Sequence, residues 1–356
     1  MTGTLEELGY TASLREHYNS VAAEGQCPGR VVEAFQELYT VSTGGRALRC
    51  TLSGRLRSRL ADRAAYPTTG DWVILAPADA TSGVIHDLMP RRGVLLRRAA
   101  GERSAAQAIA SHIDVAVIVQ SADRDFSVNR IDRYISIARA ADIRPIAVIN
   151  KADLVSPEAI GELCAAISSR HPGLHVVTSS VVETGGLEGL RAELLPGETC
   201  CFLGSSGVGK STLINALMGH ECAATGAVSE ATQRGRHTTT SRTLFALPGG
   251  ALVIDTPGMR ELGLADSGAG VEDSFAEIRD LARACRFSDC SHQEEPGCAV
   301  RAAIDEGSLA PAALDSYLRL RREARRFEQS AAELRRTERK HGKMIKQILR
   351  EKRDRW

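Results

Sequence analysis

Apolar and polar positions follow different periods in successive parts of the chain. Residues 1–27 carry only a weak helical pattern, between Leu5 and Val21, and are expected to form an N-terminal extension. Residues 28–105 contain short apolar stretches separated by Gly, Pro, Ser and Asp, which predicts five or six short strands. So many short strands in so few residues favour a small β-barrel.

From about residue 106, strand-like apolar runs alternate with segments of helical spacing. The strand-like runs are residues 113–119, 145–149, 174–177, 199–203 and 252–254. The helical segments are residues 129–141, 157–169 and 211–218. This alternation predicts a parallel sheet with helices on its faces, in an α/β domain over residues 106–275. Residues 276–356 hold a cysteine cluster and a long Arg-rich segment, which predicts an α-helical metal-binding domain with a basic helical tail.

Size and composition favour a cytoplasmic protein of several domains. The chain has 356 residues, 43% of them hydrophobic and 25% charged, and no apolar stretch is long enough to cross a membrane. Residues 1–14 lack the basic segment and apolar run of a secretory signal. An odd number of cysteines, nine, argues against a disulfide framework and for a reducing compartment. We expect a monomer.

The net charge of +1 conceals an uneven distribution. Residues 319–356 contain 15 Lys/Arg against 6 Asp/Glu, and residues 46–104 contain 11 against 5. Two basic regions that flank an acidic middle indicate a polyanionic partner. The basic balance makes an oligonucleotide-binding (OB) barrel that binds RNA the best fit to residues 28–105. For the tail, an ordinary solvated helix and a helix packed on the α/β domain stay open as alternatives.

A phosphate-binding motif stands between an apolar strand and an apolar helix. The residues that match G-x-x-x-x-G-K-[ST] are Gly204, Ser205, Ser206, Gly207, Val208, Gly209, Lys210 and Ser211, followed by Thr212. Such a P-loop lets backbone N–H groups curl around phosphates at the start of a helix. Lys210 is expected to reach the β- and γ-phosphates, and Ser211 to bind Mg²⁺.

A guanine-reading tetrad, Asn150-Lys151-Ala152-Asp153, ends a strand some fifty residues before the P-loop. The Asp153 carboxylate can accept hydrogen bonds from N1–H and the exocyclic amine of guanine, a donor pair that adenine lacks. Asn150 can bind the purine edge or brace the P-loop, and Lys151 can lie along the base. Ser179 and Ser180 end the next strand, where a backbone contact to guanine O6 is expected. Because the tetrad follows the P-loop in most GTPases, the reversed order predicts a circularly permuted domain.

Two further segments predict the Mg²⁺ and γ-phosphate side of the site. Asp255 ends a strand as a second Mg²⁺ contact, and the Gly258 N–H can meet the γ-phosphate. In residues 235–240, Thr239 (with Thr238 as second choice) is expected to complete the Mg²⁺ shell. His237 could position or polarise the attacking water. Met259 stands where many GTPases carry a water-orienting glutamine, which predicts hydrolysis that is slow or depends on His237 or on a partner.

Three cysteines and one histidine within fourteen residues predict a structural Zn²⁺ site. The four ligands are Cys285, Cys290, His292 and Cys298. Three thiolates and one imidazole leave no open position, as in structural rather than catalytic zinc sites. The polar loop between them has no core of its own, so the metal would supply its folding energy.

The whole set of motifs resembles the small-subunit ribosome biogenesis GTPase A family, a family of circularly permuted GTPases of the TRAFAC class. The resemblance rests on motifs in this order: residues 28–31, 70–73, 131–134, 150–153, 204–211, 235–240, 255–258 and 285–298. It implies an OB barrel, a permuted P-loop GTPase domain and a zinc domain, with GTP/GDP, Mg²⁺ and one Zn²⁺ as ligands. The histidine of residues 235–240, thought to act in hydrolysis in the family, is His237 here.

The resemblance further implies a factor in late maturation of the small (30S) ribosomal subunit. The protein would bind the subunit and its 16S rRNA in the GTP form, with other assembly factors nearby and no membrane, and leave after subunit-stimulated hydrolysis. The alternative is a GTP-gated rRNA-binding scaffold or checkpoint in which hydrolysis is incidental. A P-loop kinase for a small molecule would leave the tetrad and the zinc cluster without a role.

Overall fold

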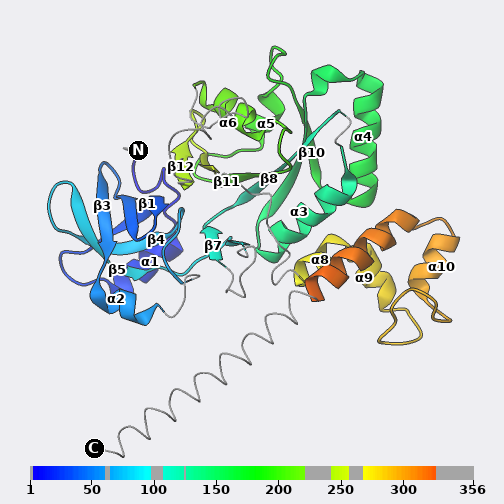
Figure 1. The fold of residues 1–356 in the computed structure, drawn as a ribbon, viewed down its shortest axis with the longest axis horizontal. Coiled ribbons are helices and arrows are strands. Elements are labelled where there is room, and N and C mark those ends of the chain that lie inside the picture. The colour runs from blue at the N-terminus through cyan, green and yellow to red at the C-terminus, as the bar shows by residue number, and fades with distance from the viewer. Residues whose placement is uncertain are drawn as a thin grey trace, which may run out of the picture.

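The computed structural model describes residues 3–60, 65–97, 107–123, 126–220, 242–255 and 268–325. In these ranges the chain forms a barrel, a central α/β region and a C-terminal group of helices, with the α/β region in the middle (Figure 1). No helix in the described ranges is long and apolar enough to span a membrane.

Residues 27–88 form a closed, five-stranded barrel. Its strands are β1 (Cys27–Phe35), β2 (Leu38–Ser42), β3 (Ala47–Leu52), β4 (Trp72–Pro77) and β5 (Ser82–Leu88). They pair in the order β1-β2-β3-β5-β4, and β4 pairs with β1 to close the ring. Only β3 and β5 run parallel to each other. This topology confirms the predicted OB fold.

Strict alternation of side chains fills the barrel. In β3, for example, Leu48, Cys50 and Leu52 are buried and the residues between them are exposed. The helix α2 (Gly54–Arg59) follows β3, and its Ser53 cap accepts a hydrogen bond from the Leu56 N–H. The N-terminal helix α1 (Ala12–Val21) begins at the cap Thr11 and packs through Leu14. The residues expected to be an extension therefore contribute to a core.

The α/β region is a sheet whose parallel strands alternate with helices, as predicted. Its strands pair in the order β10-β9-β8-β11-β13-β12. Those strands are β8 (Val115–Ser121), β9 (Arg144–Asn150), β10 (His175–Ser179), β11 (Thr199–Leu203), β12 (Arg242–Ala246) and β13 (Leu252–Asp255). All run parallel except β12, which is antiparallel to β13.

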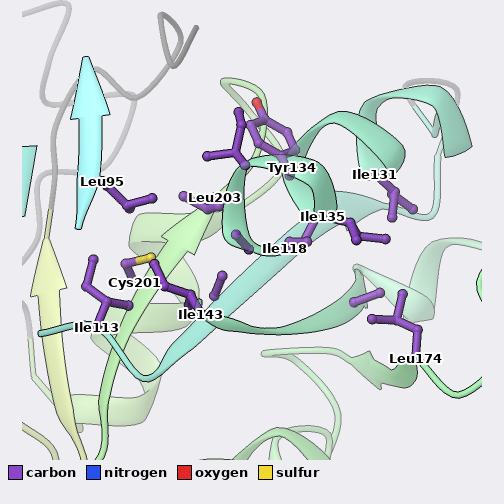
Figure 2. Close-up of a cluster of buried hydrophobic side chains, with 14 of the residues drawn as sticks. Leu95, Ile113, Ile118, Ile131, Tyr134, Ile135, Ile143, Leu174, Cys201 and Leu203 are labelled. Carbon is purple, nitrogen blue, oxygen red and sulfur yellow. The ribbon is translucent and has the colours of Figure 1, made fainter. Parts of the chain in front are cut away.

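Helices cover both faces of this sheet. The connecting helices are α3 (Val128–Ala140), the 3₁₀ turn η1 (Ala152–Leu154), α4 (Pro157–Arg170), α5 (Glu188–Ala192) and α6 (Lys210–Met218). One core cluster joins alternate residues of β8 such as Val117 to α5 and α6. The other joins Ala116 and Ile118 of β8 to α3, whose Ile135 lies beside Ile118 in Figure 2. Two-sided burial explains why β8 has no polar alternation over residues 115–119.

The sheet continues into the barrel. Strand β12 pairs with β1, so that the two parts share one eleven-stranded sheet, with β12 next to the barrel in Figure 1. A small antiparallel pair, β6 (Leu95–Arg97) and β7 (Gln107–Ala110), lies in the connection from β5 to β8.

The C-terminal helices are α8 (Gly268–Ser274), α9 (Ala276–Ala282), α10 (Ala299–Asp305) and a helical segment over residues 311–325. Of these, α8 and the last helical segment pack against α3, while α9 packs on α8 and α10 on α9. A Cβ on Gly270 would lie 2.2 Å from the Ser136 carbonyl oxygen, so α8 and α3 approach closely. The described start of the basic tail packs on this region, where Arg133 of α3 pairs with Glu323 at 2.8 Å.

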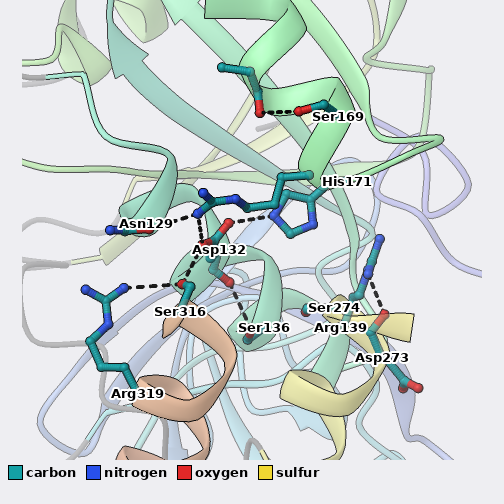
Figure 3. Close-up of polar contacts among 12 residues, drawn as sticks. Asn129, Asp132, Ser136, Arg139, Ser169, His171, Asp273, Ser274, Ser316 and Arg319 are labelled. Atoms are coloured by element: carbon teal, nitrogen blue, oxygen red, sulfur yellow. Dashed lines mark hydrogen bonds and ion pairs between the residues drawn. The ribbon is translucent and has the colours of Figure 1, made fainter. Parts of the chain in front are cut away.

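One buried carboxylate ties these helices together. Asp132 on α3 lies 2.7 Å from His171 Nε2, and it accepts hydrogen bonds from the Ser316 hydroxyl at 2.6 Å and from Arg170 at 3.0 Å. Its side chain is fully buried, and Figure 3 shows His171 and Ser316 on either side of it. The C-terminal helix, residues 311–325, is thus attached to the α/β region through the buried Asp132 carboxylate, whose charge is compensated by hydrogen bonds.

Candidate nucleotide site and metal centre

The predicted nucleotide-binding residues lie at the carboxyl ends of neighbouring strands. Asn150 ends β9, Ser179 ends β10 and Asp255 ends β13, while the P-loop follows β11. Because these strands are parallel and adjacent, their carboxyl ends share one edge of the sheet, where ligands bind in open α/β folds. Residues far apart in the sequence, such as Asn150 and Val208, 58 positions apart, are therefore in contact.

The P-loop turn depends on its glycines. Gly204 and Gly209 adopt positive φ angles of 150° and 96°. A Cβ on Gly204 would lie 2.4 Å from the Val119 carbonyl oxygen, and one on Gly209 would lie 2.3 Å from Asn150 Nδ2. No larger side chain fits at either place, so the glycines allow the loop to pack against β8 and the tetrad.

Lys210 is the first residue of α6, directly after the P-loop glycines. Its ammonium group donates hydrogen bonds to the carbonyl oxygens of Gly204 at 2.8 Å and Ser205 at 2.6 Å. The lysine thus curls over its own loop, and Ser211 follows it on the first turn of the helix. A cation and a helix N-terminus at one place make a phosphate site.

Asp255 supplies a carboxylate close to this lysine. Burial raises the pKa of the Asp255 carboxyl above its ordinary value, while the positive charge of Lys210 acts in the opposite direction. A buried carboxylate beside a phosphate site is favoured in its charged form when a cation binds. Asp255 therefore fits a Mg²⁺ contact.

Asn150 braces the P-loop. Its Nδ2 donates to the Val208 carbonyl oxygen at 2.9 Å, and its Oδ1 accepts from the Ser179 hydroxyl at 3.0 Å. Of the two roles that the sequence left open, bracing is the one that these contacts describe. The hydrogen bonds join the base side of the site to the phosphate side.

Asp153 is held in place by Ser180, whose hydroxyl donates to Asp153 Oδ1 at 2.7 Å. The same hydroxyl accepts from the N–H groups of Val182 and Glu183, each at 3.3 Å. The Ser180 N–H donates to the Gly186 carbonyl oxygen at 3.0 Å. Both serines thus orient the tetrad through their side chains.

Sequence reasoning missed Asp123 as part of this site. Lys151 adopts a positive φ of 60°, and its ammonium group lies 3.4 Å from Asp123 Oδ2. Asp123 stands two residues after the end of β8, at the same edge of the sheet. An acidic residue directly after a buried strand was the available signal.

The other predicted residues of the γ-phosphate side lie outside the described ranges. They are His237, Thr238, Thr239, Gly258 and Met259. Ser206, Gly207 and Thr212 lie in the P-loop and the first turn of α6, as the motif predicts.

The four predicted zinc ligands converge between α9 and α10. Their ligand atoms all lie within 4.8 Å of one another. Cys285 and Cys298 Sγ are 3.9 Å apart, and His292 Nδ1 lies 3.6 Å and 3.5 Å from these two sulfurs. A tetrahedral Zn²⁺ with Zn–S bonds of about 2.3 Å separates its sulfurs by about 3.8 Å. The donor set and its spacing therefore fit one structural Zn²⁺.

Comparison with known proteins decides the family. A family model described as RsgA GTPase matches residues 88–265, half of the chain. The chain belongs to the RsgA GTPase family. The small ribosomal subunit biogenesis GTPase RsgA of Opitutus terrae is 44% identical over 90% of this chain and 89% of that protein. The protein of the same name from Streptomyces coelicolor is 38% identical over 98% of this chain and 96% of its own length.

Solved structures agree with the permuted RsgA fold. YjeQ from Thermotoga maritima matches 84% of this chain and 98% of its own, with a TM-score of 0.64 and 28% identity. YloQ, described as a circularly permuted GTPase, matches 85% of this chain and 96% of its own, with a TM-score of 0.63. At 24% identity YloQ shows the fold alone. The circular permutation predicted from the motif order is confirmed.

Family membership makes this chain a GTP hydrolase that uses GTP/GDP and Mg²⁺. When bound, Mg²⁺ supplies positive charge beside the β- and γ-phosphates. Among the described residues, the predicted binding groups are the P-loop, the buried carboxylate of Asp255 and the tetrad whose Asn150 braces the P-loop. Catalysis in such a site is mainly a matter of positioning and electrostatics.

Proposed function

We propose that this RsgA-family GTPase acts in late maturation of the small ribosomal subunit. It binds the 30S subunit and its 16S rRNA in the GTP form and dissociates after the subunit stimulates hydrolysis. One observation carries the proposal: relatives named small ribosomal subunit biogenesis GTPase align with 90–98% of this chain, a length that extends well beyond the nucleotide domain. Subunits are assembled in the cytoplasm, which is the compartment we propose.

Roles in the site follow from chemistry and position. Lys210 and the P-loop backbone bind the phosphates, and Ser211, Thr239 and Asp255 hold Mg²⁺. Asp153 reads guanine, and His237 positions the attacking water. The hydrogen bonds of Asn150, Asp153 and Lys210 support these assignments. We also propose domain boundaries at residues 28, 106 and 276, which the closed barrel and the helical C-terminal region support.

The barrel and the zinc region are proposed to contact rRNA. On the barrel, α2 presents Arg55, Arg57 and Arg59 within six residues. Arginines at a surface bind phosphate backbones through charge, so binding to the subunit should weaken as salt rises.

The experiment is GTP hydrolysis by the purified protein with and without small subunits, with large subunits and ATP as controls. We expect strong stimulation by small subunits and GTP together, and by neither control. Equal rates with and without small subunits would overturn the ribosomal assignment, while the GTPase assignment would stand.

One observation favours a second candidate, a GTP-gated scaffold in which hydrolysis is incidental. Met259 stands where a water-orienting glutamine is common, so intrinsic hydrolysis has no such group. Replacing His237 by Ala distinguishes the two. If the variant still binds GTP and the subunit but no longer leaves the subunit, hydrolysis controls release and the first proposal is favoured. If subunit maturation is unaltered, the scaffold is favoured.

A further inference from the structure

The barrel is joined to the nucleotide domain by a strand that lies between two parts of the predicted Mg²⁺ site. Strand β12 begins at Arg242, three residues after Thr239. It pairs with β13, which ends at Asp255. Thr239 is therefore close to β12 along the chain, and Asp255 is close to it across the sheet. A shift of either residue would act on β12.

The strand register places Glu33 of the barrel and Asp255, the predicted Mg²⁺ ligand, in one row across β12. Asp255 of β13 lies opposite Thr243 of β12, and Thr243 lies opposite Glu33 of β1. Adjacent strands are about 4.8 Å apart, so the backbone of Glu33 lies about 10 Å from that of Asp255. The barrel thus begins two strands away from the predicted metal ligand.

A barrel side chain also holds the first residue of β12. The Thr69 hydroxyl donates to the Arg242 carbonyl oxygen at 2.9 Å, and Thr69 is fully buried. Within the described residues, the β1–β12 ladder spans two residue pairs, which include Arg242 itself opposite Ala34. Because this ladder is so short, the hydrogen bond from Thr69 contributes a large part of the interaction between β1 and β12.

A separate contact fixes the other part of β1. Arg30 is buried and donates to the Thr199 hydroxyl at 2.8 Å and to the carbonyl oxygens of Gly70 and His112 at 3.1 and 3.3 Å. It also donates to the Leu8 carbonyl oxygen and lies over the Trp72 ring. These bonds attach the barrel to the start of β11, at the end of the sheet away from the nucleotide.

Strand β1 is irregular between these two attachments. It pairs with β4 through residues 27–30 and with β12 through residues 33–34, and its register with β2 shifts between Val31 and Glu33. A bulge is a place where a strand bends. Arg30 attaches the N-terminal half of β1 to β11. A displacement of β12 must therefore alter the pairing of Glu33 and Ala34 with β12 and cannot move the whole barrel.

We propose that the β1–β12 joint, closed by Thr69, couples the barrel to the Mg²⁺ side of the nucleotide site. Exchange of GDP for GTP changes how firmly β1 pairs with β12, and a ligand on the barrel acts back on the nucleotide by the same linkage. Thr69 is a positioning residue, since it acts through Arg242 and has no hydrogen bond to a predicted nucleotide ligand within the part of the chain that the structure describes. The inference rests on the proposed roles of Thr239 and Asp255.

The test is backbone hydrogen exchange of β1, residues 27–35, in the full-length protein with GDP and with a non-hydrolysable GTP analogue. Thr69→Val keeps the shape of the side chain and removes the hydroxyl. Thr43→Val is the matched control, because the Thr43 hydroxyl also donates to a backbone carbonyl, that of Arg46, but within the barrel. Nucleotide affinity and thermal unfolding are measured on the same samples.

We expect the exchange rate of β1 to differ severalfold between the two nucleotides in the wild type and in Thr43→Val. In Thr69→Val the difference should fall below twofold, with both nucleotides still bound. A purely structural role would lower the unfolding temperature and leave the nucleotide difference intact, which would overturn the inference. Nucleotide binding without any response of β1 in the wild type would overturn it as well. Failure of the wild type to bind the analogue would overturn the nucleotide site itself.

Discussion

The nucleotide site and the zinc centre are both polar sites, but they are assembled in opposite ways. The nucleotide site brings together residues from 123 to 255, each held at the end of a strand by the sheet. The zinc centre uses fourteen consecutive residues, 285–298, in a loop with little regular structure. The first site is organised by the fold before its ligand arrives, whereas the second is organised by its ligand.

Removal of zinc should give the largest difference between the two sites, because it should unfold the zinc region and leave GDP binding nearly unchanged. Structural zinc sites contribute on the order of 10 kcal/mol at neutral pH, so a chelator or Cys298→Ser should unfold residues 285–305. Because the nucleotide site has its own sheet, GDP affinity should change less than twofold. Hydrogen exchange and a GDP titration on the same sample measure both. Retained protection of residues 285–305 without metal would contradict the proposed role of zinc.

Asp132 lies between the two regions, and its replacement should destabilise the protein strongly. Asp132→Ala leaves His171, Arg170 and Ser316 without their common acceptor, and breaking a buried charge network costs about 3–5 kcal/mol. Chemical unfolding measures the loss. The matched control is Asp280→Ala on α9, whose exposed ion pairs should contribute less than about 1 kcal/mol. Equal effects of the two variants would show that the Asp132 network does not stabilise the C-terminal helix.

The same carboxylate gives stability a dependence on pH. Burial raises the pKa of Asp132, but hydrogen bonds from His171 and Ser316 and the charges of His171 and Arg170 outweigh it, so the pKa lies below its ordinary value of 3.8. A depressed pKa contributes stability above pH 3.8 that is lost as pH falls through the folded-state value.

Unfolding of the wild type and of Asp132→Asn between pH 3 and pH 6 measures this contribution. Zinc release at low pH affects both proteins alike, so the difference between them isolates Asp132. We expect the wild type to lose its advantage over the variant as pH falls. A constant difference across this range would exclude the depressed pKa.

Ser180 should give the smallest effect, confined to the nucleotide site. Ser180→Ala removes the hydrogen bond that orients Asp153, which is worth about 0.5–1.5 kcal/mol, or a roughly 2- to 13-fold loss of GDP affinity. Ser169→Ala, which removes an exposed hydroxyl on α4, is the control and should leave affinity unchanged. Calorimetric titration with GDP compares the two. No change in Ser180→Ala would mean that Asp153 is oriented by other contacts.

Local motifs allowed much of this account to be predicted from the sequence. The zinc ligands are close in the chain, and their spacing alone identified the cluster that the structure brings together. The P-loop and the tetrad each fit a short pattern on a strand end, and their order predicted the permutation. The barrel followed from short strands and turn residues.

Contacts between distant segments could not be predicted in this way. The pairing of Asp123 with Lys151 and the acceptors of Arg30 depend on how the strands are ordered, which no local period encodes. Asp132 stood in a recognised motif, yet its role appears only when α3, α4 and the C-terminal helix meet. For the same reason residues 1–27 looked like an extension although Leu8 and Leu14 are buried.

The most direct test of the nucleotide site is its choice of base. The affinities of the wild type and of Asp153→Asn for GDP and ADP are measured by calorimetric titration with Mg²⁺. The carboxylate accepts from two guanine donors, and sites with such polar groups discriminate by factors on the order of 10⁴. We predict that the wild type binds GDP at least 1,000-fold more tightly than ADP, as an order-of-magnitude bound, and that the variant loses most of this preference. Equal binding of GDP and ADP by the wild type, or an unchanged preference in Asp153→Asn, would contradict a guanine site built around the tetrad.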